Sequence, residues 1–264
     1  MLPSATRAEH PQSVRQIGQM RVESFPSRPE MAAASAGAIA ATIRDLLAKQ
    51  ATVRMIFAAA PSQAEMLARL TAAKDIDWSR IIAFHMDEYV GLQPAAPESF
   101  VAWLDAHLFR KVPFGEVYRI VPEPDPEAAA NRYAARLAAA PIDIVCLGIG
   151  VNGHIAFNDP PVADFDDPKD VKIVVLDDVC RQQQVDDNCF ARFEDVPETA
   201  LTLTIPRLRR AGQLFCVVPG ASKREAVRAA LYGPVTTGCP ASILRQTDCI
   251  LYLDAESDPD VRQD

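Results

Sequence analysis

Paired cysteines are missing from this 264-residue sequence. None of its six cysteines belongs to a CxxC pair, and none is spaced with a histidine in the way that a structural zinc site requires. Several of them, such as Cys146 and Cys216, lie inside apolar runs, which is typical of buried thiols that stay reduced. We therefore expect a cytoplasmic protein with reduced cysteines and without a bound metal ion.

Long apolar runs are missing as well. No run approaches the length that crosses a membrane, and the first residues, MLPSATRAEHPQSV, lack the apolar core of a signal peptide. The 27 basic residues are outnumbered by 35 acidic ones, which gives a net charge of −8. This balance disfavours nucleic acid and anionic membranes as partners. An anionic small substrate stays possible, because a local basic pocket matters more than the total charge.

What the sequence does have is the composition of a globular protein, with 49% hydrophobic and 23% charged residues. Residues 1–28 are polar with scattered prolines and predict an extended or loosely attached N-terminal arm. From residue 29 to residue 264, apolar strand-like runs alternate with helical patterns. This alternation predicts a single α/β domain with a doubly wound, mainly parallel sheet and helices on both faces.

The boundaries of these elements follow from apolar runs, prolines and glycines. We expect strands over residues 52–60, 80–86, 142–150, 171–177, 200–206, 213–220 and 248–254. We expect helices over residues 30–49, 61–73, 97–109, 125–140 and 222–233. In such sheets ligands collect at the carboxyl ends of the strands, so the residues that follow each strand are the places to look for chemistry.

The first such strand end reads RIIAFHMDEYVGL, residues 80–92. Asp87 and Glu88 come directly after a buried strand and are followed by Tyr89. A carboxylate here could act as a base at the mouth of the sheet. The alternative is a pair of solvated loop acids, which the spacing taken alone favours.

The second strand end is LGIGVNGHIAFNDPP, residues 147–161. Its glycines, which allow sharp turns and a close approach of backbone to a ligand, are Gly148, Gly150 and Gly153. His154 follows them and can titrate near neutral pH, while Asn152 and Asp159 could hold its imidazole. The alternative is a histidine that caps a helix or is satisfied in the core. The letters GIGVNG match a dinucleotide fingerprint, but no early βαβ context or suitably spaced acid supports that use.

The third strand end reads CVVPGASKREAV, residues 216–227. Ser222 and Lys223 stand at the start of a predicted helix, where free amides, the helix dipole and an ammonium group would bind a phosphate. The alternative is an N-capping serine beside a solvated lysine. Ser62, near the N-terminus of another predicted helix, could donate a hydrogen bond to the same anion.

Taken together, these motifs resemble the glucosamine-6-phosphate deaminase (isomerase) family, within the superfamily that includes 6-phosphogluconolactonase. FHMDEYVGL is similar to the family's F-N-M-D-E-Y-V-G-L, and LGIGVNGHIAFNDP is similar to its G-x-G-x-[DN]-G-H-I-[AG]-F-N-E-P. VPETALTLTI and PGASK also match in order and spacing. The resemblance covers roughly residues 30 to 255.

The resemblance implies roles for the polar residues of these motifs. Asp87 matches the family's base for the C2 proton, and His154 matches the residue that opens the pyranose ring. Asn152 stands where many members have aspartate, and Asp159 stands where the family usually has glutamate. Both are expected to act with the catalytic pair.

The resemblance also implies a substrate-binding set. Lys223 matches the phosphate-binding lysine, and Ser62 matches a hydroxyl of the phosphate loop. Glu88, Gly150 and Gly153 are expected beside the substrate.

Two segments depart from the family pattern. The phosphate loop, usually of the type G-[ST]-T-P, reads AAAPSQ, which keeps Ser62 but has no glycine. A segment like R-x-x-N-x-R-F-F, which carries an arginine for the phosphate, reads CRQQQVDDNCFARFEDVP, with Arg181 and Arg192 as candidates. These departures leave open which sugar is bound and whether it is phosphorylated.

The implied activity is that of a glucosamine-6-phosphate deaminase/isomerase-like hydrolase, which converts an amino sugar phosphate to a ketose phosphate and ammonia. It needs no cofactor, takes a small-molecule sugar phosphate as its partner, and is a possible homo-oligomer. One alternative is a 6-phosphogluconolactonase-like hydrolase that uses His154 to activate water. The MDEY block favours the deaminase, because carbon-acid chemistry needs a base placed like Asp87. Another alternative is a non-catalytic sugar-phosphate sensor, which the acidic charge and the short N-terminal arm disfavour.

Overall fold

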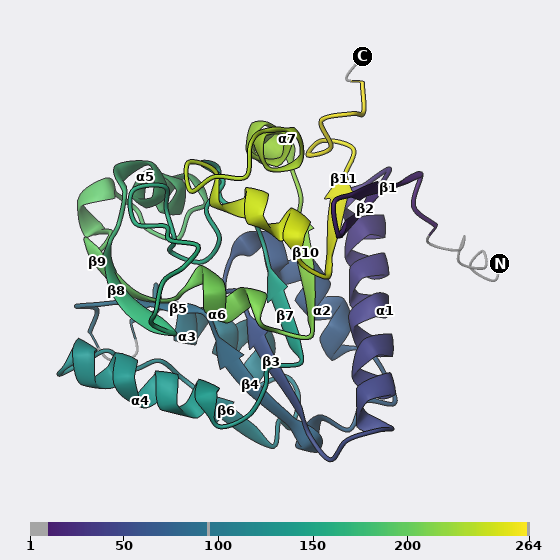
Figure 1. The fold of residues 1–264 in the computed structure, drawn as a ribbon. Coiled ribbons are helices and arrows are strands. Elements are labelled where there is room, and N and C mark those ends of the chain that lie inside the picture. The colour runs from purple at the N-terminus through teal and green to yellow at the C-terminus, as the bar shows by residue number, and fades with distance from the viewer. Residues whose placement is uncertain (1–9, 94–95, 263–264) are drawn as a thin grey trace.

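The computed structural model describes residues 10–93 and 96–262 and contains a central eight-stranded sheet (Figure 1). Neighbouring strands are parallel, except that β1 and β2 are antiparallel. In spatial order the strands are β1 (Ser13–Ile17), β2 (Met20–Phe25), β11 (Cys249–Asp254), β10 (Gln213–Val218), β7 (Ile144–Leu147), β3 (Val53–Phe57), β4 (Ile81–His85) and β6 (Glu116–Tyr118). The predicted mainly parallel sheet is confirmed.

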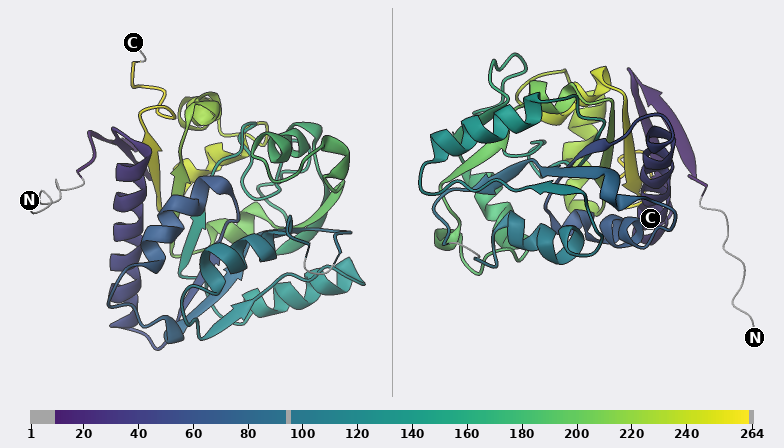
Figure 2. Two further views of the ribbon diagram at one scale, coloured as in Figure 1. Left: turned by 180° about the vertical axis from the view of Figure 1, so that it is seen from behind. Right: turned by 90° about the horizontal axis from the view of Figure 1, so that it is seen from below.

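Helices cover both faces of this sheet (Figure 2). Residues of α1 (Arg28–Leu47), α2 (Ala64–Thr71) and α3 (Phe100–Leu104) pack in one apolar cluster. Residues of α4 (Pro126–Ala138), α6 (Ile205–Arg209) and α7 (Arg224–Tyr232) pack in a second cluster on the opposite face. No helix in residues 10–93 and 96–262 is both long and apolar enough to cross a bilayer.

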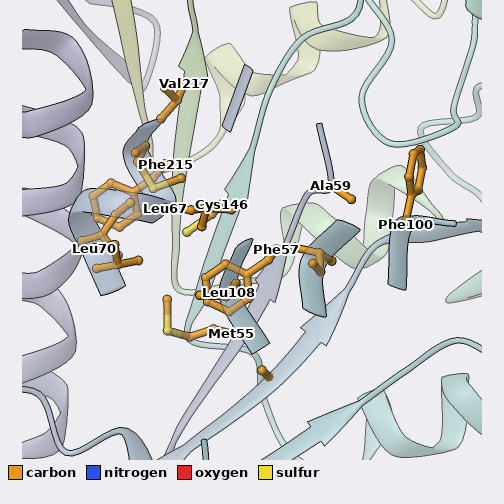
Figure 3. Packing of buried hydrophobic residues seen from close by; sticks show 14 of the residues in the cluster. Met55, Phe57, Ala59, Leu67, Leu70, Phe100, Leu108, Cys146, Phe215 and Val217 are labelled. Carbon is orange, nitrogen blue, oxygen red and sulfur yellow. The ribbon is translucent and has the colours of Figure 1, made fainter. Parts of the chain in front are cut away.

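The central strands are apolar on both sides because each face of the sheet is covered. In β3, Met55 and Phe57 point into the first cluster, whereas Ile56 points into the second. Figure 3 shows Met55 and Phe57 beside Leu67 and Leu70 of α2. A strand that buries side chains on both faces has no polar alternation, which explains why these strands appear in the sequence as continuous apolar runs.

A second sheet of three antiparallel strands was not expected. It consists of β5 (Asp87–Tyr89), β9 (Thr199–Leu203) and β8 (Val171–Val175). Only Met86 separates β4 from β5, and its carbonyl accepts a hydrogen bond of 2.8 Å from the Leu203 backbone amide. The chain therefore passes from one sheet to the other within a single residue, directly before Asp87.

The expectation of a loosely attached arm over residues 1–28 is wrong for the part that the structure describes. Ser13–Phe25 forms the hairpin β1–β2, and β2 pairs in parallel with β11. The side chains of Met20, Val22 and Phe25 are buried, so this segment adds apolar surface to the core. Gly18 has φ +63° and makes the hairpin turn that the sequence analysis missed. Residues 1–9 lie outside the described residues.

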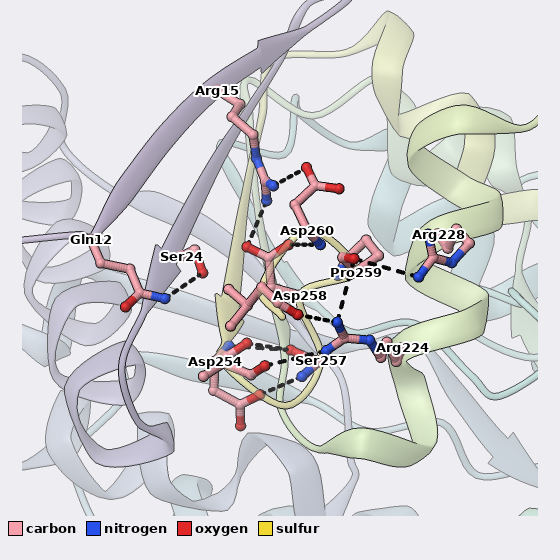
Figure 4. A network of polar contacts seen from close by, with 12 residues as sticks. Gln12, Arg15, Ser24, Arg224, Arg228, Asp254, Ser257, Asp258, Pro259 and Asp260 are labelled. Atoms are coloured by element: carbon pink, nitrogen blue, oxygen red, sulfur yellow. Dashed lines mark hydrogen bonds and ion pairs between the residues drawn. The ribbon is translucent and has the colours of Figure 1, made fainter. Parts of the chain in front are cut away.

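Polar contacts join this hairpin to the C-terminal residues (Figure 4). The Arg15 guanidinium donates a hydrogen bond of 2.8 Å to the Asp258 carboxylate and also binds Asp260. Asp258 is fully buried, with 0% of its surface exposed. Its other carboxylate oxygen accepts a hydrogen bond of 2.9 Å from the Asp260 backbone amide. Arg15 is thus the cation that compensates a buried charge.

We predict that Arg15→Ala lowers the free energy of unfolding by about 2–3 kcal/mol, because it leaves the buried Asp258 carboxylate without its charged donor. Chemical denaturation at neutral pH measures the change. Arg21→Ala is the matched control: Arg21 lies in the same hairpin, and its 2.6 Å contact with Glu23 is exposed, so its loss is worth about 0–1 kcal/mol. Equal effects of the two substitutions would contradict the prediction.

Candidate active site

A cleft lies at the carboxyl ends of four neighbouring strands, β10, β7, β3 and β4. Each strand contributes the residues that follow it. These are residues 58–63 after β3, 86–87 after β4, 148–150 after β7 and Lys223 after β10. His154 lines the same cleft, so the structure brings together Asp87, His154, Ser62, Lys223 and Gly150 as the sequence predicted.

Asp87 is the carboxylate of this cleft and is only 6% exposed. It lies in β5, where its backbone pairs with Thr202 of β9. Burial raises the pKa of Asp87 well above its usual value, and the nearby acids Glu88 and Asp159 raise that pKa further. A carboxylate held in this way accepts a proton more strongly than an exposed one.

His85 fixes the backbone at Asp87, and the sequence analysis assigned it no role. The His85 Nε2 atom accepts a hydrogen bond of 2.7 Å from the Ile120 amide. His85 Nδ1 therefore carries the proton, which it donates over 3.0 Å to the Asp87 carbonyl oxygen. Burial lowers the pKa of His85 to about 3, so this fully buried ring is neutral and adds no charge beside the carboxylate.

The His154 imidazole is oriented by two side chains of its own loop. Its Nδ1 atom lies 2.8 Å from Asn152 Oδ1 and 2.9 Å from Asp159 Oδ1. Asn152 also donates a hydrogen bond of 2.9 Å to Asp159, and its Oδ1 atom accepts one of 3.0 Å from the His154 amide. With two acceptors at Nδ1, the proton of the neutral ring belongs there. The Nε2 lone pair is then available for chemistry, and Asp159, although one methylene shorter than glutamate, reaches the ring.

Asp159 has the opposite electrostatic environment to Asp87. Burial by itself would raise the pKa of Asp159, but its contacts with His154, Asn152 and Cys180 hold that pKa below its usual value. Within the described residues, His154, Asp159 and Cys180 form the one group of three whose geometry could hold a metal ion. His154 and Asp159 are already hydrogen-bonded to each other, and burial raises the pKa of the Cys180 thiol. The group therefore fits an oriented imidazole better than a metal centre.

The two predicted substrate glycines have different roles. A Cβ atom on Gly150 would lie 2.1 Å from Cε1 of the His154 ring, so glycine is what lets the ring lie against the backbone. Gly153 has φ +84°, and a Cβ atom there would lie 2.7 Å from Cys239 Sγ. Gly153 therefore shapes the turn and its packing, and it does not line the cleft.

Lys223 and Ser62 are the two residues that the family resemblance assigns to the phosphate of the substrate. Lys223 is 6% exposed, and burial lowers its pKa, an effect that the nearby Asp187 opposes. Ser62 lies in a 3-10 turn, residues 61–63, that leads into α2, where its hydroxyl accepts a hydrogen bond of 3.3 Å from Gln63. An ammonium, a hydroxyl and nearby amides are the donors that bind an anion.

Neither candidate arginine lines the cleft. Arg181 donates a hydrogen bond of 2.8 Å to the Val196 carbonyl and stacks on Phe193, and Arg192 pairs with Asp195 at 2.7 Å on the surface. The sequence analysis missed what α5 (Asp178–Asp186) does supply, because it predicted no helix there. That helix and its C-cap supply Gln183, Gln184 and Asp187 to the cleft.

Glu88 was expected beside the substrate, and the structure places it elsewhere. Its carboxylate accepts hydrogen bonds of 2.8–3.0 Å from three backbone amides. One is that of the next residue, Tyr89, and the other two are those of Phe100 and Val101 at the start of α3. It lines a separate cavity, because successive side chains of a strand point to opposite faces. Burial raises the pKa of Glu88 to about 7, against the effect of these three donors.

The fold and the cleft define the class of protein: an enzyme with a strongly basic carboxylate and an oriented imidazole at the carboxyl edge of a parallel sheet. Residues 26–252 match the family model described as glucosamine-6-phosphate isomerases/6-phosphogluconolactonase. The chain belongs to this family.

Individual relatives agree with this assignment. A glucosamine-6-phosphate deaminase of Exiguobacterium sibiricum is 39% identical over 184 residues, which are 69% of this chain and 71% of the relative. One of Streptococcus pneumoniae is 37% identical over 188 residues, 69% and 77% of the two chains. The structure of a monomeric glucosamine-6-phosphate deaminase superposes with a TM-score of 0.81 at 26% identity, covering 89% of this chain and 98% of that one. A 6-phosphogluconolactonase from Thermotoga maritima, at 19% identity and a TM-score of 0.71, covers 89% and 99% and shares the fold.

We predict that Gly150→Ala lowers kcat by about 100-fold, because the added methyl group displaces the His154 ring by about 1 Å or more. Steady-state kinetics of the purified variant, with circular dichroism to check folding, measures the effect. Gly37→Ala is the control, since a Cβ atom there meets nothing within 4 Å and alanine suits the α1 helix. A folded Gly150→Ala enzyme with full activity would show that the ring position is not critical.

We predict that Asp87→Asn stabilises the fold at alkaline pH. Because the folded-state pKa of Asp87 is raised, the folded state holds this proton more tightly than the unfolded chain does. The carboxylate therefore costs stability as pH rises from about 4 through the raised pKa, and the full cost is present above it. The melting temperature of Asp87→Asn should exceed that of the parent at pH 8, with a gap that closes toward pH 4. A gap that widens toward acid would reverse the assigned direction.

Proposed function

We propose that this chain is a glucosamine-6-phosphate deaminase, which converts glucosamine 6-phosphate to a ketose phosphate and ammonia. The observation that carries the proposal is the pairing in one cleft of a buried carboxylate of raised pKa, Asp87, with an imidazole whose Nε2 atom is free, His154. The curated relatives described as glucosamine-6-phosphate deaminases support the same substrate.

His154 acts first, on the cyclic form of the sugar. In that form the C2–H bond is not acidic, because no carbonyl group lies beside it. The Nε2 atom moves the proton of the C1 hydroxyl to the ring oxygen, which opens the ring and frees the aldehyde. Asp159 and Asn152, as acceptors at Nδ1, stabilise the imidazolium that forms during this transfer.

Asp87 acts on the open-chain sugar. The C2 proton now lies α to a carbonyl group, and the Asp87 carboxylate takes it to give an enolamine. Asp87 returns the proton to C1, and the resulting imine at C2 adds water and loses ammonia. A positioned general base of this kind contributes about 10²- to 10⁴-fold to the rate. The net reaction is an aldose–ketose isomerisation coupled to hydrolytic loss of the amine.

The phosphate of the substrate binds at Lys223 and Ser62 in this proposal. Both line the cleft, and Lys223 makes no ion pair within 4.0 Å in the described part of the chain. A buried ammonium without a carboxylate partner gains much from an anionic ligand. The substrate phosphate supplies that anion.

The cysteines support a cytoplasmic location for this enzyme. All six are free, and five of them are buried. Such thiols stay reduced in the cytoplasm, where disulfides are rare. A homo-oligomeric state stays a prediction, and one structural relative is described as monomeric.

Ammonia release from glucosamine 6-phosphate tests the proposal. We expect turnover by the parent chain and a loss of about 10²- to 10⁴-fold in kcat for Asp87→Asn. The acid limb of kcat/KM should lie above the usual aspartate pKa of about 4, because the raised pKa of Asp87 means that the base is still protonated there.

Other outcomes identify the alternatives. Hydrolysis of a 6-phosphosugar lactone without ammonia release would indicate the lactonase, in which His154 activates water. Binding of glucosamine 6-phosphate without turnover, unchanged in Asp87→Asn, would indicate a sugar-phosphate sensor.

A further inference from the structure

The helix α5 presents three polar residues to the cleft. Asp187 follows Gln183 by four residues and Gln184 by three, spacings that make it a neighbour of both on a helix, and all three residues line the cleft. They face a cleft whose other walls carry the catalytic residues and Lys223. No arginine of the described residues lines this cleft, and α5 brings amides and a carboxylate to the place where an anionic substrate group would lie.

Gln183 is bound to protein groups at both polar atoms of its carboxamide. Its Oε1 atom accepts a hydrogen bond of 2.9 Å from the Val151 amide in the turn that carries His154. Its Nε2 atom donates one of 3.1 Å to Asp187 Oδ2. Gln183 therefore links the Asp187 carboxylate to the turn that carries His154.

Gln184 differs from its neighbour. It is 7% exposed, and its side chain makes no hydrogen bond to any residue that the structure describes. Its amide oxygen and nitrogen are not among the fully buried, unpaired polar atoms of the described residues, so they are open to the cleft and available to a ligand. The carboxamide offers both a donor and an acceptor to that ligand.

Asp187 is the carboxylate that acts most strongly on Lys223. Burial lowers the pKa of Lys223, and the negative charge of Asp187 raises that pKa in part. Within residues 10–93 and 96–262, no ion pair within 4.0 Å joins Lys223 and Asp187, and both residues line the cleft. A group bound to Lys223 therefore lies in the field of a fixed negative charge. That field opposes a dianion more than a monoanion or a neutral hydroxyl group.

We propose that Gln184 and Asp187 determine substrate specificity by reading the charge of the group that binds at Lys223. Gln184 donates a hydrogen bond to this group, and Asp187 weakens the binding of its dianionic form. The inference rests on the proposed function, because it takes the cleft as a sugar-phosphate site. It adds that the affinity for a phosphorylated sugar is limited by this chain's own carboxylate.

The experiment measures binding in the full chain carrying Asp87→Asn, in which turnover of the sugar is slowed by about 10²- to 10⁴-fold. Calorimetry at pH 7.5, where a phosphate ester is mostly dianionic because its second pKa is about 6, gives Kd for glucosamine 6-phosphate and for glucosamine. Asp187→Asn keeps the acceptor for Gln183 but removes the charge. It should tighten glucosamine 6-phosphate roughly tenfold and leave glucosamine unchanged.

Two further variants sharpen the test. Asp186→Asn is the matched control, since Asp186 is exposed on the same helix and binds Gln182 at 2.9 Å. It should change neither Kd. Gln184→Glu adds a charge at nearly constant shape and should weaken glucosamine 6-phosphate roughly tenfold, with a smaller effect on glucosamine.

The proposal is overturned if Asp187→Asn leaves the Kd of glucosamine 6-phosphate unchanged or weakens it, or if Gln184→Glu affects both sugars equally. Absence of binding of either sugar overturns it as well, since no pocket then exists at Lys223. The expected Kd pattern without ammonia release by the parent chain would support this inference and refute the proposed deaminase activity, so the two failures are distinguishable.

Discussion

Burial of the Asp87 carboxylate is the constraint on which the rest of the site depends. An ionised carboxylate in an apolar setting opposes folding, yet the same setting makes it a strong base. The surrounding structure holds it there by backbone contacts: β5 pairs with β9, and the neutral His85 ring binds the Asp87 carbonyl. A positive charge on His85 would lower the pKa of the nearby Asp87 carboxylate and weaken it as a base. The main chain at Asp87 is thus held by hydrogen bonds, whereas the charges that act on its carboxylate are those of two other acids, Glu88 and Asp159.

The Gln183 side chain joins two walls of the cleft by hydrogen bonds. Gln183 bonds to the Val151 amide, in the turn that carries His154, and to Asp187, which lines the same cleft as Lys223. The loop of His154 and the Asp187 carboxylate are therefore held by the same amide. This arrangement explains why α5, a polar helix without a large apolar face, is nevertheless ordered against the cleft.

The sequence predicted the central strands and most of the cleft for identifiable reasons. β3 and β7 are apolar on both faces, and Asp87 and His154 lie in long, specific motifs. β1 was missed because only alternate residues of that short strand are partly buried. Glu88 was misplaced because it follows Asp87 in a strand, where the side chains of successive residues point to opposite faces. Gln184 was missed because α5 is a polar segment without a clear apolar period, so no helix was predicted there.

The pairing of β2 with β11 has a consequence for how the chain is made. Arg21 lies opposite Ile250, so β2, an early strand in chain order, waits for β11, the last strand of the described sheet. Until then the hairpin and the β10 edge both present unpaired backbone, and the contact joins residues that are far apart in sequence. Completion of the sheet is thus a late event in synthesis, and nascent chains depend on protection of those edges in the meantime.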